Sequence, residues 1–141
     1  MTKDLLLKID NVSSGYGSTI IVNDFSFDVE KGQILAITGS NGMGKTTLMK
    51  TIMGLIEVRK GSIFFKNEDI TNSSPDYRSK SGIGYVPQGR EIFSALTVEQ
   101  NIMLPIYTRK KPSFNVLEKL EEIYSLFPIL KEKRSANGSS L

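Results

Sequence analysis

The chain has 141 residues, with 18 basic and 15 acidic side chains and a net charge of +3, which is enough for one small domain. It contains no cysteine and no histidine, which excludes a disulfide framework, thiolate metal sites and imidazole chemistry. The basic residues do not form part of a nucleic-acid-binding sequence pattern, and no apolar stretch reaches membrane-spanning length. We therefore expect no nucleic-acid partner and no direct membrane insertion.

Three strands are expected in the first forty residues. Alternating apolar residues between 5 and 9, and again between 20 and 30, predict two of them. The stretch 13–18, Ser-Ser-Gly-Tyr-Gly-Ser, predicts the turn that joins these two strands. The run 33–38, Gln-Ile-Leu-Ala-Ile-Thr, predicts a third strand that is short and buried.

A glycine-rich loop follows. Residues 39–46 read Gly-Ser-Asn-Gly-Met-Gly-Lys-Thr, a full match to the phosphate-binding pattern G-x-x-x-x-G-K-[ST]. Glycines allow the backbone N–H groups to approach phosphate oxygens, and the helix that follows adds its positive N-terminal end. Lys45 is predicted to reach the β- and γ-phosphates, and the Thr46 hydroxyl to bind Mg²⁺. The helix itself is indicated by apolar residues at helical spacing: Leu48, Met49, Ile52, Met53 and Ile56.

Beyond that helix, the pattern alternates between short strands and polar connections. The stretch 62–66 predicts a strand, and the polar stretch 69–80 predicts either a loop or a short surface helix. Residues 82–87 predict a further short strand that ends at a proline.

Two helices are predicted in the last third of the chain, each with its own start signal. Thr97, with a glutamine three residues later, forms a capping box for a short helix that is expected to stop before Pro105. Asn115 opens a longer helix that Pro128 terminates. One face of that helix is apolar and carries Val116, Leu120, Ile123, Tyr124 and Phe127.

Two features of nucleotide-hydrolysing proteins have no counterpart in the sequence. Downstream of Thr46, no apolar strand ends in the aspartate that would order the hydration of Mg²⁺. Asp10 ends a run that resembles such a strand only superficially, because Lys8 interrupts it, and we interpret it as a plain strand-end residue. The guanine-recognition pattern N-K-x-D and the switch pattern D-x-x-G are both missing, which argues against a GTPase.

The stretch 82–93, Gly-Ile-Gly-Tyr-Val-Pro-Gln-Gly-Arg-Glu-Ile-Phe, and the stretch 96–101, Leu-Thr-Val-Glu-Gln-Asn, carry a resemblance to a known family. Together with the glycine loop, they resemble the N-terminal part of the ATP-binding subunit of an ABC transporter, most closely the branched-chain amino acid importer type. Residues 14–17, 51–55 and 127–132 support the resemblance. It implies an α/β P-loop NTPase fold: an antiparallel β subdomain, the P-loop strand and helix, and the start of a helical subdomain.

The resemblance also implies a site for ATP and Mg²⁺. Tyr16 matches the aromatic residue that stacks on adenine, and Thr47 matches a residue that bonds the α-phosphate. Gln88 matches the glutamine that contacts Mg²⁺ and the attacking water, so Lys45 and Gln88 are the expected catalytic residues and Thr46 and Gln88 the expected metal contacts. The whole cofactor-binding set is Tyr16, Gly39, Ser40, Asn41, Gly42, Met43, Gly44, Lys45, Thr46 and Thr47.

Partners, location and extent follow from the same resemblance. It implies transmembrane permease subunits that contact the segment from about Arg90 to Leu104, a second ATP-binding subunit, and a peripheral position at the cytoplasmic face of the cell membrane. Residues 1–141 would be a partial nucleotide-binding domain, with 1–88 in the β subdomain and P-loop core and 89–141 in the helical subdomain. The chain stops at Leu141, where the family's signature motif L-S-G-G-[EQ] would begin, so we expect nucleotide docking without hydrolysis. A urea-type importer subunit, and a non-catalytic fragment that does not fold alone, are the alternatives.

Overall fold

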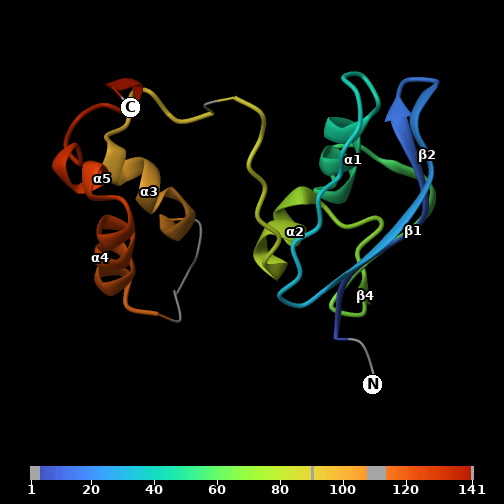
Figure 1. The fold of residues 1–141 in the computed structure, drawn as a ribbon, viewed down its shortest axis with the longest axis horizontal. Coiled ribbons are helices and arrows are strands. Elements are labelled where there is room, and N and C mark those ends of the chain that lie inside the picture. The colour runs from blue at the N-terminus through green and yellow to red at the C-terminus, as the bar shows by residue number, and fades with distance from the viewer. Residues whose placement is uncertain (1–3, 90, 108–113, 141) are drawn as a thin grey trace. The chain divides into compact units, whose positions relative to one another are not determined.

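The computed structural model describes residues 4–89, 91–107 and 114–140 (Figure 1). The chain divides into two compact units, Met1–Tyr85 and Val86–Leu141.

The first unit is built on a four-stranded antiparallel sheet in the order β2-β1-β3-β4. Its strands are β1 (Leu5–Tyr16), β2 (Thr19–Glu30), β3 (Val58–Phe65) and β4 (Glu68–Asp69). The strands predicted between 5 and 9, 20 and 30, and 62 and 66 are therefore confirmed. The turn predicted over 13–18 is wrong in extent, because Ser14 and Gly15 pair with β2 and β1 continues to Tyr16.

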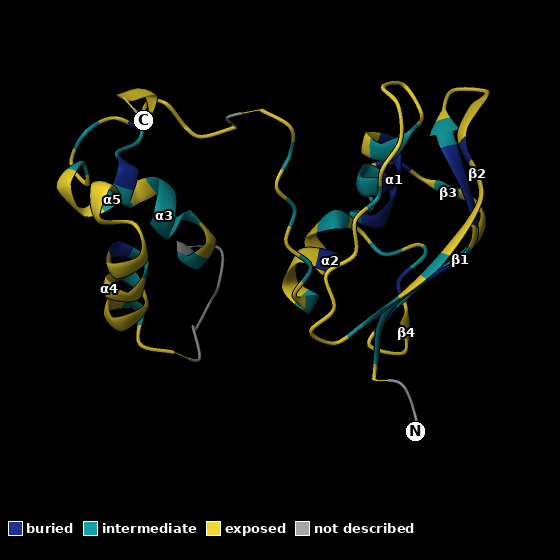
Figure 2. Cartoon of the chain, viewed as in Figure 1, coloured by how far each residue is buried: buried dark blue, intermediate teal, exposed yellow. Residues whose placement is uncertain are grey.

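The core of this unit lies between the sheet and the helix α1 (Lys45–Ile52), as the dark-blue residues of Figure 2 indicate. Helix α1 is shorter than the apolar spacing predicts. Met53 is its C-cap and Gly54, at φ 78°, takes the chain out of the helix, so that Ile56 is buried from the following loop instead. The buried cluster consists of Ile9, Val12, Val22, Leu48, Ile52, Ile63, Phe65 and Ile70.

Two predicted strands do not form. Residues 33–38 and 82–87 have no strand assignment, Ile34 is 96 % exposed and Val86 is 92 % exposed. A strand needs a neighbour to satisfy its N–H and C=O groups, and neither segment pairs with another within the described residues. Each segment therefore has the apolar composition of a strand but lacks the neighbouring strand that would bond and bury it.

The polar stretch 69–80 contains the short helix α2 (Pro75–Ser81), which settles the choice left open by the sequence. Its N-cap is Ser74, whose hydroxyl accepts a hydrogen bond from the N–H of Tyr77 at 3.2 Å, and Pro75 occupies the first helical position. Gly82, at φ 111°, ends the helix in the left-handed conformation.

The second unit is helical and contains α3 (Val98–Tyr107), α4 (Val116–Leu126), α5 (Pro128–Glu132) and the 3₁₀ turn Gly138–Ser140. The predicted capping box is confirmed: the Gln100 N–H donates to the Thr97 hydroxyl at 3.1 Å, and the Thr97 N–H donates to Gln100 Oε1 at 2.9 Å. The predicted stop before Pro105 is wrong, because α3 includes this proline and ends at Tyr107. Pro105 lies in the last turn, where its missing N–H removes a single helical hydrogen bond.

Asn115 caps α4 as predicted, since its side-chain oxygen accepts hydrogen bonds from the N–H groups of Leu117 and Glu118. The predicted apolar face is largely confirmed, with Tyr124 buried and the others half-buried, but Phe127 is 56 % exposed. Pro128 terminates α4 as predicted and also begins the short helix α5.

Candidate functional site

The glycine loop lies between the segment 33–38, which is exposed except at Ile37, and helix α1, and it passes close to strand β2. Gly44 takes a φ of 87°, and a Cβ atom placed on it would lie 3.0 Å from Ile21 Cγ2 and 3.3 Å from the Ile21 carbonyl oxygen. Both the backbone angle and the close approach therefore require glycine at this position. Gly39 and Gly42 also have positive φ values, so that the loop curls before the helix starts.

Lys45, the first residue of α1, folds back over this loop. Its ammonium donates hydrogen bonds to the carbonyl oxygens of Gly39 and Ser40, at 2.7 Å each. The ammonium thus lies against the loop carbonyls, where an anion held by the loop would meet it.

The start of α1 presents free donors to the same region. The first helical hydrogen bond runs from the Leu48 N–H to the Gly44 carbonyl at 2.8 Å, so the N–H groups of Lys45, Thr46 and Thr47 have no acceptor within the helix. No side chain caps this end. These donors, the helix dipole and the lysine together form an anion-binding arrangement.

The two threonines at the helix start differ in exposure. Thr46 is exposed, as the hydroxyl of a metal ligand needs to be, whereas Thr47 is 7 % exposed and packs into the first unit. The loop geometry, the lysine and the exposed hydroxyl fit a nucleotide phosphate chain with Mg²⁺. The role of Thr47 at the α-phosphate stays a prediction.

Tyr16 ends strand β1 next to the turn at residues 17–18, and its side chain is 51 % exposed. The guanidinium of Arg59 on β3 donates to the Gly17 carbonyl and fixes this turn. Two residues before Tyr16, the Ser14 and Thr51 hydroxyls form a fully buried hydrogen bond of 2.7 Å. Because Thr51 lies on α1, this bond joins the strand that carries Tyr16 to the helix that carries Lys45.

The sequence indicated no contact for Ser14, Thr51 or Arg59, although Ser14 and Thr51 lie in stretches that support the family resemblance. Thr47 and Thr51 are spaced by one helical turn, and the Thr51 hydroxyl donates to the Thr47 carbonyl at 2.8 Å. A local sequence pattern could not identify β1 as the strand whose Ser14 hydroxyl bonds Thr51.

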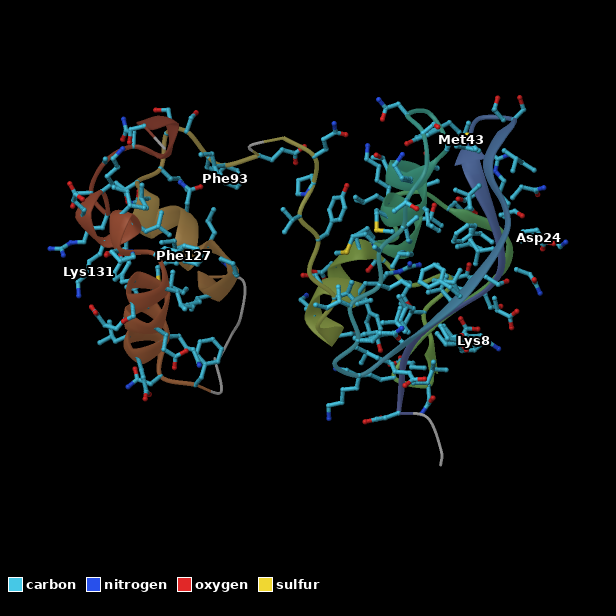
Figure 3. The ribbon with its side chains drawn as sticks, viewed as in Figure 1. Lys8, Asp24, Met43, Phe93, Phe127 and Lys131 are labelled. Atoms are coloured by element: carbon cyan, nitrogen blue, oxygen red, sulfur yellow. The ribbon has the colours of Figure 1, made fainter. Side chains whose placement is uncertain are left out.

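A cavity of about 380 Å³ opens between β2 and the loop. Ile21 and Phe25 line it from the strand, and Met43 and Lys45 line it from the loop and α1. Met43 is 71 % exposed and lies at the tip of the loop (Figure 3). The cavity therefore has an apolar side next to the cationic phosphate cradle, which suits a ligand with both an anionic and an apolar part.

Gln88 belongs to the second unit, where it is exposed. Every other predicted site residue, Tyr16 and residues 39–47, belongs to the first unit. The predicted contact of Gln88 with Mg²⁺ stays a prediction, and Arg90, at the start of the predicted permease-binding segment, lies outside the described residues.

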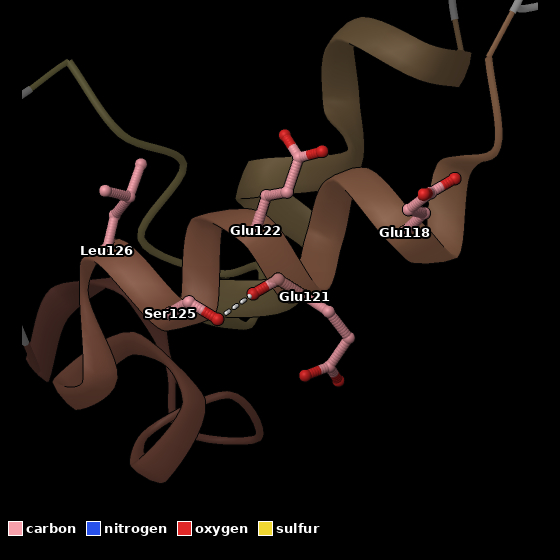
Figure 4. Close-up of a pocket in the computed structure, with 5 residues that line it drawn as sticks. All are labelled: Glu118, Glu121, Glu122, Ser125 and Leu126. Atoms are coloured by element: carbon pink, nitrogen blue, oxygen red, sulfur yellow. Dashed lines mark hydrogen bonds between the residues drawn. The ribbon is translucent and has the colours of Figure 1, made fainter.

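A second pocket, of about 560 Å³, lies on α4 and is lined by Glu118, Glu121, Glu122, Ser125 and Leu126 (Figure 4). Two of its three carboxylates form separate ion pairs. Glu122 pairs with Lys119 and Glu121 with Lys131, both at 2.6 Å. Within residues 4–89, 91–107 and 114–140, no group of three or more acidic side chains is arranged to hold a metal ion.

Comparison with known proteins shows the family to which the chain belongs. The family model described as ABC transporter matches residues 22–141. The high-affinity branched-chain amino acid transport ATP-binding protein BraG of Pseudomonas aeruginosa is 35 % identical over 136 residues, which are 96 % of this chain and 58 % of that protein. The molybdate/tungstate import ATP-binding protein WtpC of Thermococcus kodakarensis is 34 % identical over 92 % of this chain and 39 % of that protein.

Among solved structures, one described as the ATP-binding subunit of an ABC transporter superposes with a TM-score of 0.83 and 26 % identity, covering 96 % of this chain and 55 % of that one. The chain belongs to the ABC transporter family, and its fold is that of an ABC ATPase domain, a P-loop NTPase, with the antiparallel sheet and helices of the N-terminal part. It spans less than two thirds of the length of these relatives. In the part of the chain that the structure describes, no helix has the length and apolar character needed to cross a membrane.

Proposed function

We propose that this chain is the nucleotide-docking part of an ATP-binding subunit that drives amino-acid import, of the branched-chain type, from the cytoplasmic face of the cell membrane. The observation that carries the proposal is the phosphate cradle, in which the Lys45 ammonium and the free N–H groups at the start of α1 face the same curled loop. The choice of cargo rests on the resemblance of the segments 82–93 and 96–101, and on the likeness to BraG over nearly the whole chain.

Each residue has a distinct task in this proposal. The backbone N–H groups of residues 39–47 bond phosphate oxygens, and Lys45 leaves the carbonyls of Gly39 and Ser40 to contact the β- and γ-phosphates. The exposed Thr46 hydroxyl holds Mg²⁺, together with Gln88. The Tyr16 ring, half exposed at the end of β1, stacks on adenine.

Partners are part of the same proposal. The segment from Arg90 to Leu104 faces the permease subunits, and its described part carries the exposed apolar side chains of Ile92 and Phe93. A second ATP-binding subunit completes the motor. The chain docks nucleotide but does not hydrolyse it alone, because the residues that would order Mg²⁺ hydration and polarise water are absent from the sequence.

The test is a titration of the purified chain with Mg-ATP, comparing Lys45→Ala with Lys50→Ala. Both variants remove one cation from α1, but Lys50 lies in the last turn and away from the loop. We expect Lys45→Ala to weaken binding at least about tenfold, since a charge-assisted hydrogen bond contributes about 1.5–3 kcal/mol, and Lys50→Ala to bind like the wild type. Equal binding by wild type and Lys45→Ala would reject nucleotide docking at this loop.

A phosphate-release assay tests the second half of the proposal. We expect no turnover above the rate of a protein-free blank. Turnover that Lys45→Ala abolishes would show that the chain hydrolyses ATP and would reject the docking-only assignment.

One observation favours a non-catalytic alternative: the apolar residues Ile34 and Val86 are almost fully exposed in segments without a partner strand. Thermal unfolding followed by circular dichroism, with and without Mg-ATP, distinguishes the two. A cooperative transition that Mg-ATP raises supports docking by mass action. The absence of any transition supports a chain that needs a partner in order to fold.

A further inference from the structure

Arg78 on α2 is buried, and no acidic side chain of the described residues forms an ion pair with it. It is 1 % exposed, and it is the largest fully buried side chain of the described residues. Its Nε donates to the Ser73 carbonyl at 3.0 Å, and its Nη2 donates to the Thr71 carbonyl at 2.8 Å. Its Nη1 donates to the carbonyls of Thr51 and Ile52, at 2.9 and 2.7 Å. Every one of these four acceptors is a neutral backbone oxygen.

A buried guanidinium without a counter-ion is unusual, because removing a charge from water costs free energy that is normally recovered from an opposite charge. Burial accordingly lowers the pKa of Arg78 below its ordinary value. The four charge-assisted hydrogen bonds are what hold the cation in place.

Two of the four acceptors lie at the C-terminal end of α1. Thr51 and Ile52 are the last two residues of α1, the helix whose first residue is Lys45. Their carbonyls point out of the C-terminal end of the helix, where a cation also interacts favourably with the helix dipole. The glycine loop thus occupies one end of α1 and the Arg78 guanidinium occupies the other.

Gly54 provides an independent sign that the backbone is shaped around this cation. A Cβ atom at Gly54 would lie 2.9 Å from Arg78 Nε, 3.1 Å from Arg78 Cζ and 3.1 Å from the Ser73 carbonyl oxygen. Contacts of that length leave no room for the guanidinium. A glycine two residues after the end of α1 is therefore needed for Arg78 to reach the helix end, and the positive φ of 78° in this turn also favours glycine.

The side chain of Arg78 bonds residues earlier in the chain, whereas its backbone carbonyl bonds a residue later in the chain. Its carbonyl accepts a hydrogen bond from the Ile83 N–H at 3.1 Å, just after Gly82 ends α2. Ile83 packs against the core cluster and begins the segment that runs toward Gln88. One residue therefore bonds to the end of α1 through its side chain and to the start of this segment through its main chain.

From these contacts we propose that Arg78 is a positioning residue, which fixes the C-terminal end of α1 against α2 and the start of the 83–88 segment and so holds the phosphate-binding end of α1 in place (α1 and α2 in Figure 1). Arg78 touches no nucleotide in this proposal. Its effect on nucleotide affinity rests on the proposed docking function, whereas the anchoring of α1 does not.

The test compares Arg78→Met, which keeps most of the side-chain volume but removes the charge and all four hydrogen bonds, with Arg78→Lys, which keeps the charge but has only three donors. Ile70→Val, at a fully buried position of the core cluster whose backbone bonds Ile63 and Ser73 rather than α1, is the matched control for a general loss of stability. All chains are measured well below their melting temperatures. The two readouts are amide hydrogen exchange of residues 45–54 and the dissociation constant for Mg-ATP.

We expect Arg78→Met to exchange the α1 amides at least about tenfold faster and to bind Mg-ATP about tenfold more weakly, values we set from the loss of charge-assisted hydrogen bonds. Arg78→Lys should lie between Arg78→Met and the wild type, as partial rescue. Ile70→Val should change neither readout beyond its effect on global stability.

Wild-type exchange and wild-type affinity in a folded Arg78→Met chain with a lower melting temperature would overturn the proposal, because Arg78 would then be structural only. If Arg78→Met does not fold, Arg78→Lys decides, and unchanged α1 exchange in that variant overturns it. If the wild type itself binds no Mg-ATP, the proposed function fails. The exchange data then decide the anchoring alone: faster α1 exchange supports it and unchanged exchange rejects it.

Discussion

The buried hydrogen bond between Ser14 and Thr51 allows a quantitative test of how β1 is joined to α1. The Thr51 hydroxyl donates its proton to the Thr47 carbonyl, so the Ser14 hydroxyl must be the donor in the 2.7 Å bond between the two side chains. Both residues are 0 % exposed, so water cannot replace a missing partner. The two possible truncations therefore leave different groups behind.

Ser14→Ala removes the donor and leaves the Thr51 hydroxyl bonded to the Thr47 carbonyl. We expect it to lower the free energy of unfolding by about 1 kcal/mol, the net value of one neutral hydrogen bond. Thr51→Val leaves the Ser14 O–H buried without an acceptor and should cost about 2 kcal/mol, since an orphaned buried donor costs about 1–3 kcal/mol. The double variant leaves no orphan, so its cost should be about 1.5 kcal/mol rather than the additive value of about 3 kcal/mol.

The assay is urea unfolding followed through the NMR signals of β1 and β2, which report on the first unit alone. A change of 1 kcal/mol corresponds to a shift of about 4–8 °C in the melting temperature of a unit of this size. Two results would refute the reasoning: a smaller cost for Thr51→Val than for Ser14→Ala, or a double variant whose cost equals the sum of the single costs.

Three further outcomes follow from other contacts. Gly61→Ala should destabilise the sheet by at least about 2 kcal/mol, since Gly61 has φ 85° and a Cβ there would lie 2.3 Å from two carbonyl oxygens of β1; a thermal melt unchanged within 1 °C would contradict this. Asn101→Ala should speed amide hydrogen exchange in residues 93–97 at least about tenfold, because the Asn101 side chain bonds the N–H and carbonyl of Phe93 and two further carbonyls. Unchanged exchange would show that the conformation of this segment does not depend on these bonds. Burial, and then the hydrogen bond to Glu99, raise the pKa of Tyr124 from about 10 to about 12, so its contribution to stability is complete below pH 10 and is lost as the pH rises through 12. Tyr124→Phe should remove that loss from the unfolding free energy of the second unit between pH 10 and 12, and a parallel decline in both proteins would contradict the assignment.

Local features of the fold were predictable from the sequence. The helix start at Thr97 and the cap at Asn115 depend on residues two or three positions apart, and both form as expected. The loop at 39–46 and the helix that follows it depend on glycine and lysine spacing, and the Lys45 ammonium does lie within the loop. These elements require no knowledge of distant segments.

Features that depend on distant partners were not predictable. The apolar run at 33–38 has the composition of a buried strand, but composition cannot show whether a neighbouring strand is available, and Ile34 is exposed. Arg78 shows the opposite case. It lies in a polar stretch that indicates a surface, yet it is buried because carbonyls from two separate segments, 51–52 and 71–73, converge on its guanidinium. The roles of Tyr16, Thr47 and Gln88 remain predictions drawn from resemblance.

The two hydrogen bonds from Lys45 to the loop carbonyls also bear on how tightly this cradle can hold an anion. An arriving anion has to compete for the ammonium with Gly39 and Ser40, so binding exchanges one set of acceptors for another. The affinity for the anion is then the difference between two similar sets of contacts, and it is weaker than the contacts with the anion alone would give. Weakening the hydrogen bonds from Lys45 to these two carbonyls would raise the affinity for an anion more directly than adding a new donor to the site.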